Sequence, residues 1–172
     1  MNPFNQALKI IQEIQLKQST TNFLNKDIID AVKNGDLEKI KTFSKEHLNG
    51  SSNLYMGSGR PLIFDALYGF RSSEVLKLMI DMGTEVNCVD TGFPQRSPLM
   101  QAVKSGTFEQ IKILVEGGAD LNFTGNLNDV YFPQSIIGTA LFYKRFEIVN
   151  YLEEHGGVYI KNEKKNILEY IN

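Results

Sequence analysis

Few residues in the sequence have the types and spacing that catalysis or metal binding needs. The two histidines, His47 and His155, lie far apart, and neither belongs to a His-x-x-x-His or Cys-His grouping. Zinc and similar metals are held by several such ligands at short spacings. The sequence therefore predicts no metal site. Each histidine lies near the end of an expected helix, which favours a capping role.

Cys88 is the only cysteine, so an intramolecular disulfide and a multi-cysteine metal site are both excluded. It follows Asn87 at the start of an expected loop. A reactive thiol needs nearby positive charge to favour the thiolate, and no such charge is evident around it. The pattern favours a tolerated small residue. The chain needs no oxidising compartment, and its start lacks the pattern of a secretory signal, so we expect a cytoplasmic protein.

Two short segments resemble ligand-binding loops without having the required spacing. The segment Gly57-Ser58-Gly59-Arg60 lacks the Gly-x-x-x-x-Gly-Lys-Ser/Thr pattern of a phosphate loop. Asn126, Asn128 and Asp129 lack the spacing and the terminal Glu of a calcium loop. No Ser-His-Asp order suggests nucleophilic catalysis either. The sequence thus predicts no cofactor and no enzyme, although an enzyme with a cryptic site in a groove remains an alternative.

The composition describes a globular domain of nearly balanced charge. The 172 residues include 18 Lys or Arg and 20 Asp or Glu, giving a net charge of −2, and 42% of residues are hydrophobic. No bulk field favours nucleic acid or anionic lipid, and no apolar run has the length of a transmembrane helix. We therefore expect neither a nucleic acid nor a membrane as partner.

Glycine, proline and asparagine recur at a regular interval along the chain. Gly83 and Gly118 are separated by 35 residues, and so are Asn87 and Asn122. A period in the middle thirties predicts a stack of supersecondary units. Four segments align at this period, namely 27–46, 60–87, 97–122 and 138–157.

Each unit is expected to contain two short helices. In the third unit Ser97 and Pro98 suit a helix start, and Gly106 suits a helix end with positive φ. A second apolar stripe, beginning at Phe108, ends at Gly117-Gly118. Small residues recur in the first helices, where close packing leaves little room: Ala31, Ala66, Ala102 and Ala140.

On these residues the chain resembles the ankyrin-repeat family. Ser97 to Ala102 matches the family's Thr-Pro-Leu-His-x-Ala signature, and Gly117 to Asn122 matches its Gly-Ala-Asp-Val-Asn. The second unit matches through Arg60-Pro61-Leu62 and Gly83 to Asn87. Departures are also present. Ile63 and Met100 replace the signature His, Gly138-Thr139 stands in place of a Pro start, and Lys144 replaces a loop Gly.

The resemblance implies an all-α ankyrin-repeat solenoid of about four helix pairs with an N-terminal helix and a C-terminal capping helix. The expected divisions are an N-terminal helical extension over 1–24, repeats over 25–161 and a capping helix over 162–172. Within the repeats, the units cover about 27–58, 59–94, 95–133 and 134–161. In the extension, Phe4, Leu8, Ile11 and Ile14 share one face, which we expect to cover the end of the stack or, alternatively, to dock a partner or a second copy of the chain.

The resemblance also implies a binding surface, made by the concave face of the first helices and by the loop tips. On the helices, it points to the two positions before the terminal Gly. At the loop tips, it points to aromatic, Arg and neighbouring residues of the kind that anchor interfaces. The expected partner-binding residues are Lys33, Asn34, Tyr55, Met56, Arg60, Leu67, Tyr68, Phe93, Gln95, Arg96, Lys104, Ser105, Tyr131, Phe132, Phe142 and Tyr143.

Taken together, these features predict a monomeric, non-catalytic module that binds another protein. A sharper hypothesis is a stoichiometric inhibitor of an enzyme, or an immunity protein that neutralises a toxin. The abundance of Lys, Asn and Ile is typical of a low-GC bacterial or viral genome, where small proteins of this kind occur. A secreted effector or scaffold directed at host proteins is the alternative.

Overall fold

The computed structural model describes residues 6, 9–13, 26–50, 60–68, 73–90, 95–125, 133–161 and 163–171. This part of the chain consists of helices joined by loops. Its β-type pairing includes two isolated bridges, between Asp90 and Arg96 and between Thr124 and Ser135. The helices follow one another in pairs, and the all-α prediction is confirmed for these residues.

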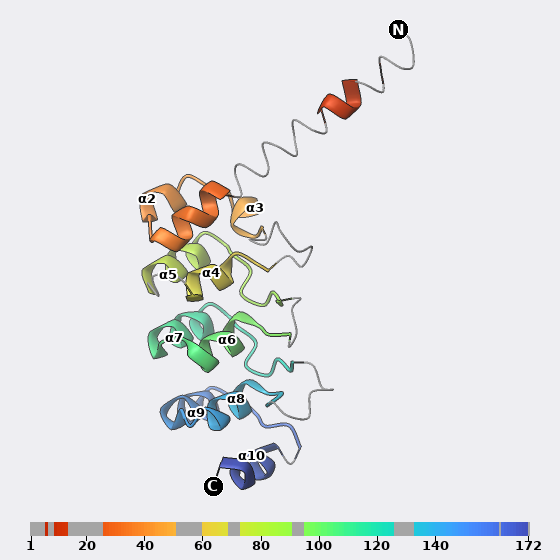
Figure 1. The fold of residues 1–172 in the computed structure, drawn as a ribbon. Coiled ribbons are helices and arrows are strands. Elements are labelled where there is room, and N and C mark those ends of the chain that lie inside the picture. Colours follow the sequence, from red (N-terminus) through yellow and green to blue (C-terminus); the bar gives the residue numbers. More distant parts are fainter. Residues whose placement is uncertain are drawn as a thin grey trace.

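The pairs consist of a first and a second helix, and they stack in chain order (Figure 1). The first helices pack against one another in a row, and α10 extends this row beyond α8. The second helices form a parallel row. The first helices are residues 26–34, α4 (Ile63–Tyr68), α6 (Pro98–Ser105) and α8 (Ile136–Phe142). The second helices are α5 (Ser73–Asp81), α7 (Phe108–Glu116) and α9 (Phe146–Glu154), and α10 spans Glu163–Ile171.

In the first pair, two short helices take the place of one second helix. They are α2 (Leu37–Ile40) and α3 (Lys45–Leu48), and the chain turns between them. Ser44 precedes α3, and His47 Nδ1 lies 3.0 Å from its Oγ. Ser44 N also donates to His47 Nδ1 over 3.4 Å, so His47 caps the start of α3. The sequence had suggested a role at a helix C-terminus instead. At the other end of the stack, His155 Nδ1 lies 2.7 Å from the Tyr151 carbonyl and donates to it.

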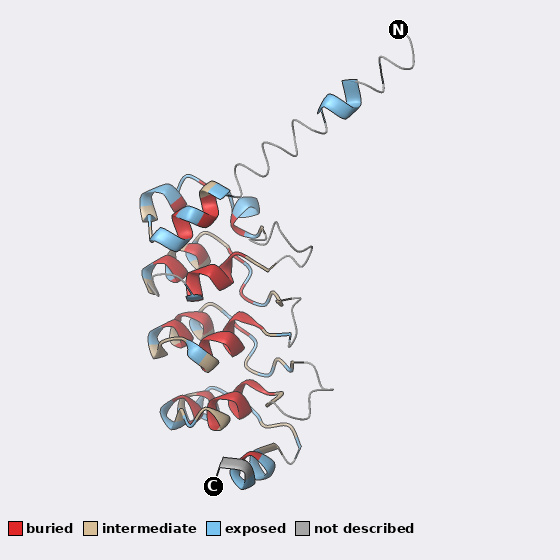
Figure 2. Cartoon of the chain, in the orientation of Figure 1, coloured by how far each residue is buried: buried red, intermediate tan, exposed pale blue. Residues whose placement is uncertain are grey.

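One continuous apolar core runs through the stack, as the buried faces of the helices show (Figure 2). Each helix contributes a stripe of aliphatic side chains, and each fully buried one stabilises the fold by about 1.5–3 kcal/mol relative to exposure. The small residues of the first helices lie at the centre. Ala102 and Ala140 are both fully buried, which fits the close helix packing expected from their recurrence.

A repeated asparagine joins each unit to the next, and we call this series the asparagine ladder. Asn87 Nδ2 donates to the Gly118 carbonyl over 3.0 Å, and its Oδ1 accepts from Asp120 N over 2.8 Å. One amide side chain thus pairs with two backbone groups of the following loop. The same two bonds join Asn49 to Gly83 and Glu85, and Asn122 to Gly156 and Val158.

The glycines at helix ends serve two different purposes. Gly118 has φ of 86°, a left-handed conformation that side chains disfavour, as expected for the end of α7. Gly106 does not: its φ is −84°, so the prediction of a positive φ there is wrong. A Cβ at Gly106 would lie 2.9 Å from Ala102 Cα and from Gln110 Oε1. Lack of space, rather than backbone conformation, explains this glycine.

Arg145 binds the carbonyls at the end of α6, where the chain lacks the usual left-handed glycine turn. Its guanidinium donates to the carbonyls of Val103 over 2.6 Å, Gly106 over 2.8 Å and Ala102 over 3.0 Å. The last carbonyls of a helix lack the usual partners within the helix, although Ala102 O also accepts from Gly106 N over 2.7 Å. Burial lowers the pKa of Arg145, whereas Glu147 acts in the opposite direction. The fourth unit is thereby joined to the third through one cation.

Gly138 is the third residue of α8 rather than a substitute for a Pro start. Ser135 caps α8, and its hydroxyl accepts from Gly138 N over 2.9 Å. Glu163 of α10 reaches into the space that a side chain at 138 would need, and accepts from Ser135 N and Gln134 N. Glu163 therefore fastens the capping helix to the loop before α8.

Residues 9–13 belong to the predicted N-terminal extension and are helical. Their side chains are all exposed, with Ile10 at 52% and Ile11 at 49%, and this helical segment lies apart from the stack (Figure 2). These residues therefore do not cover the end of the stack in this structure. Phe4, Leu8 and Ile14, the other apolar residues of the expected face, lie outside the described residues.

Candidate functional site on the first-helix face

The row of first helices presents a surface that we call the first-helix face. It consists of the outward positions of these helices and the described loop residues beside them. Counting two positions on from the buried Ala31, Ala66, Ala102 and Ala140 gives one residue in each unit. These four residues are Lys33, Tyr68, Lys104 and Phe142, two cations and two aromatic side chains. Repetition of the fold therefore brings cationic and aromatic side chains alternately into one row.

Two of these four side chains are well exposed. The side chain of Lys33 is 52% exposed, and Tyr68 is 47% exposed. Lys104 and Phe142 are half-buried, because each contacts the ring of Tyr143. Lys104 Nζ lies 5.9 Å from that ring, and the Phe142 ring meets it edge-on at 5.3 Å. Tyr143 thus supports the C-terminal part of the face.

Leu67 was expected on this face, but it is 4% exposed and packs in the core. The expectation counted back from Gly69, as if this glycine matched Gly106. Counting from the buried Ala66 and Ala102 instead aligns Leu67 with Val103, which is fully buried. We therefore leave Leu67 out of the candidate site.

A buried carboxylate holds the N-terminal part of the face together. Asp65 is 2% exposed, and its Oδ1 accepts from Arg60 Nη2 over 2.9 Å. Lys33 Nζ, from the preceding unit, lies 3.8 Å from the same oxygen. A buried charge is tolerated when it is paired in this way. Asp65 therefore positions two cations at the surface, one from each of two neighbouring units.

Sequence reasoning did not identify Asp65 as a site residue. The available signal was a single acid inside the apolar run from Leu62 to Leu67. Acidic side chains are almost never fully buried unless they are paired. An acid at that point of an apolar helix therefore required a cation nearby, and Arg60 was the nearest candidate in the sequence.

In the next unit, an amide occupies the position of this acid. Gln101 aligns with Asp65, and Arg96 aligns with Arg60, each pair being five residues apart. Arg96 Nη1 donates to Gln101 Oε1 over 3.3 Å, and Gln101 Nε2 donates to Ser105 Oγ over 2.8 Å. The second arginine is thus positioned by a neutral group.

Tyr68 contacts the first of these arginines and lies within the electrostatic reach of the second. The Arg60 guanidinium carbon lies 5.1 Å from the centre of its ring, a cation–π distance. Burial raises the pKa of Tyr68, whereas the charges of Arg60 and Arg96 act to lower it and that of Asp90 adds to the rise. Arg60, Tyr68 and Arg96 therefore form one cluster that spans the second and third units.

The remaining predicted residues divide by whether the structure describes them. Asn34, Gln95 and Ser105 are exposed on or beside the first-helix face. Five aromatic or apolar residues of the loop tips lie outside the described residues: Tyr55, Met56, Phe93, Tyr131 and Phe132. The candidate site is therefore argued from the helices and the described parts of the loops.

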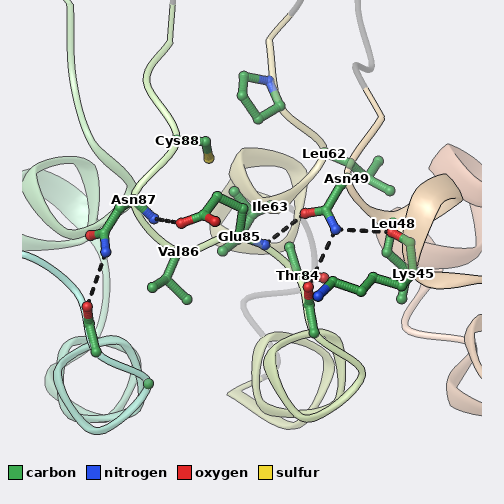
Figure 3. A pocket seen from close by; sticks show the side chains of 14 residues that line it. Lys45, Leu48, Asn49, Leu62, Ile63, Thr84, Glu85, Val86, Asn87 and Cys88 are labelled. Atoms are coloured by element: carbon green, nitrogen blue, oxygen red, sulfur yellow. Dashed lines mark hydrogen bonds between the residues drawn. The ribbon is translucent and has the colours of Figure 1, made fainter.

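A pocket lies beside the asparagine ladder (Figure 3). It has a volume of about 550 Å³, and its lining includes Lys45, Asn49, Glu85, Asn87 and Cys88. Its two amides are already engaged by backbone groups of the next unit. Burial, together with the nearby charge of Glu85, raises the pKa of the Cys88 thiol to about 11. The thiol is therefore protonated near neutral pH and is a poor nucleophile.

Neither metal chemistry nor membrane insertion gains support from the described residues. In this part of the chain, no group of three or more His, Cys, Asp or Glu side chains is placed to hold a metal ion. None of its helices combines the length and apolar character needed to cross a membrane.

Comparison with known proteins agrees with the stacked helix pairs. A family model described as ankyrin repeats, in three copies, matches residues 62–166, which is more than half of the chain. No curated protein is similar enough in sequence to count as a match. The matched region contains α4 to α9 and the ladder residues Asn87 and Asn122. The chain belongs to the ankyrin-repeat family, whose repeats serve as protein–protein interaction modules.

Proposed function

We propose that this chain binds another protein through its first-helix face and has no catalytic activity of its own. The observation that carries the proposal is the row Lys33, Tyr68, Lys104 and Phe142. The fold repeats the same position four times, and of these four side chains only Phe142 packs partly against the core. A surface for general solvation would have no need of an exposed tyrosine and a half-buried phenylalanine in one row.

The residues beside this row have the composition of an interface. Tyrosine and arginine are enriched among residues whose loss weakens binding most, and phenylalanine is enriched in interface cores. The face contains Arg60 and Arg96 close to Tyr68, and Phe142 against Tyr143. The arginines are held by hydrogen bonds, so less side-chain freedom is lost when a partner binds.

We further propose that the partner is inhibited by occlusion. A chain of 172 residues made largely of repeats can cover an active site or an interface of another protein in a one-to-one complex. An immunity protein that neutralises a toxin is the form of this proposal that we favour. No disulfide is needed for the fold, since Cys88 is the only cysteine, and this is compatible with action in the cytoplasm.

A pull-down from the source cell, followed by mass spectrometry, tests the binding proposal. The bait is the full chain, compared with a variant carrying Tyr68→Ser and Phe142→Ser on the first-helix face. The control carries Lys77→Ser and Glu109→Ser on the second helices. We expect the captured partner to be lost with the first variant only. Equal capture by all three baits would contradict the proposed face.

Titration of the purified partner tests the inhibition proposal. We expect the partner's own activity to disappear at one equivalent of this chain and to return with the Tyr68→Ser, Phe142→Ser variant. Undiminished partner activity in a saturated complex would contradict inhibition and would favour a scaffold.

A further inference from the structure

The two faces of the stack differ in their charge. The second helices α5, α7 and α9 carry seven acidic and two basic residues. The first helices and the described loop residues beside them carry five cations, namely Lys26, Lys33, Arg60, Arg96 and Lys104, and four acids, namely Asp27, Asp30, Asp65 and Asp90. Asp27 pairs with Lys39 of α2, and Asp65 is buried. The near-neutral net charge of the chain therefore conceals an acidic side and a side with a cationic cluster.

The cations of the first-helix face are not equally compensated. Asp65 Oδ1 is shared by Arg60 and Lys33. Arg96 is positioned instead by the uncharged Gln101, and among the described residues no carboxylate oxygen lies within ion-pair distance of its guanidinium. A guanidinium that is oriented by an amide keeps its full charge for an external anion. Its planar fork is suited to a carboxylate.

We propose that the cluster of Arg60, Tyr68 and Arg96 receives an acidic segment of the partner protein. This inference rests on the proposed function and specifies the chemistry of the partner. A carboxylate side chain pairs with Arg96, the Tyr68 hydroxyl offers a further hydrogen bond, and Lys33 and Lys104 attract acids on either side. The complementary charges also steer the segment toward this face and away from the acidic second helices.

A peptide titration followed by NMR tests the proposed chemistry without knowledge of the partner. The probe is a ten-residue polyglutamate peptide, compared with polyglutamine of the same length, and the readout is the set of backbone amide shifts of the full chain. We expect polyglutamate, but not polyglutamine, to shift amides around residues 60, 68 and 96. Raising the salt concentration weakens the effect, because these charges are partly exposed.

Charge-neutral variants locate the site. We expect Arg96→Gln to weaken polyglutamate binding by about tenfold or more, in line with the loss of a charge-assisted pair. The control Lys77→Gln removes the same charge from α5 on the other face and is expected to change binding by less than about twofold. Circular dichroism of both variants checks that the fold is retained.

Three results would overturn the inference. The first is an absence of shifts on the first-helix face at millimolar polyglutamate. The second is an equal loss of binding in the Arg96 and Lys77 variants, which would indicate a diffuse attraction. The third is tighter binding of a ten-nucleotide thymidine oligomer than of polyglutamate at the same salt concentration, which would favour a nucleic acid.

Capture of the cellular partner by the variants distinguishes a failure of this inference from a failure of the proposed function. If its capture is lost with Tyr68→Ser and Phe142→Ser but unchanged with Arg96→Gln, the binding face stands and the acidic segment does not. If capture withstands all of these changes, the face itself is contradicted.

Discussion

The asparagine ladder and the first-helix face are both built by repetition, but they use it in opposite ways. In the ladder, one residue type recurs three times and makes the same two backbone hydrogen bonds each time. On the first-helix face, one position recurs four times and carries Lys33, Tyr68, Lys104 and Phe142. A repeated position that keeps its chemistry serves the stack, whereas one that changes its chemistry is available for recognition.

This contrast predicts where substitutions affect folding and where they affect binding. Contacts that join one unit to the next determine stability, because a repeat stack derives much of its stability from the interfaces between neighbours. Side chains on the first-helix face contribute little to those interfaces, with Asp65 and the residues around Tyr143 as the exceptions.

The largest loss of stability is expected for Arg145→Ala. The variant removes three hydrogen bonds to the end of α6 and leaves its carbonyls without the cation, at a cost of about 3 kcal/mol. Urea unfolding of the full chain measures this cost. Arg145→Lys keeps the positive charge but lacks the planar guanidinium, so it is expected to lose less stability than Arg145→Ala. A loss below about 1 kcal/mol would show that water replaces the guanidinium at no great cost.

The next largest effect is expected for Ala102→Leu. Ala102 is fully buried where α6 packs against its neighbours, and the larger side chain overpacks this contact by roughly 1–3 kcal/mol. Ser105→Leu is the matched control, because Ser105 lies on the same helix but is exposed. An unchanged thermal midpoint for Ala102→Leu would contradict the close packing of the first helices.

Much of the fold could be predicted from the sequence, because its determinants are local and recur. Asn87 and Asn122, and Gly83 and Gly118, mark the same turn one period apart. The alanines mark the buried side of each first helix, and the structure places Ala102 and Ala140 there. Periodicity reveals such residues without any knowledge of distant contacts.

The errors arose where a residue's role depends on how other residues fold around it. Gly106 is required by the space that Ala102 and Gln110, both close in the sequence, leave around it, and Gly138 by the carboxylate of the distant Glu163. Neither reason can be read from residue type and spacing alone. Leu67 was misplaced because Gly69 was taken as a marker, although the buried alanines set the register of the helix. The pairing of Arg60 with Asp65 was missed for a related reason. Without the alignment set by the buried alanines, Asp65 was not recognised as a buried position.

The asparagine ladder allows a graded test of its two bonds. Asn87→Ala loses both the donor and the acceptor and is expected to cost about 1.5 kcal/mol, since the ladder is exposed and water competes for its bonds. Asn87→Asp keeps an acceptor for Asp120 N but places a carboxylate oxygen against the Gly118 carbonyl, so it is expected to cost at least as much. Thermal and urea unfolding compare the two. A clearly smaller cost for Asn87→Asp would assign most of the effect to the accepted bond.

The smallest effect on stability is expected on the first-helix face, for Lys33→Ala. Its ion pair with Asp65 spans 3.8 Å at a half-exposed side chain, and Arg60 remains to pair the acid, so the change is at most about 0.5 kcal/mol. Binding of polyglutamate is nevertheless expected to weaken, because Lys33 attracts acids at one edge of the cluster. Unfolding and peptide titration of the same variant thus separate the two roles. A stability loss as large as that of Asn87→Ala would mean that Lys33 belongs to the structural contacts, and the contrast between the two surfaces would fail at this position.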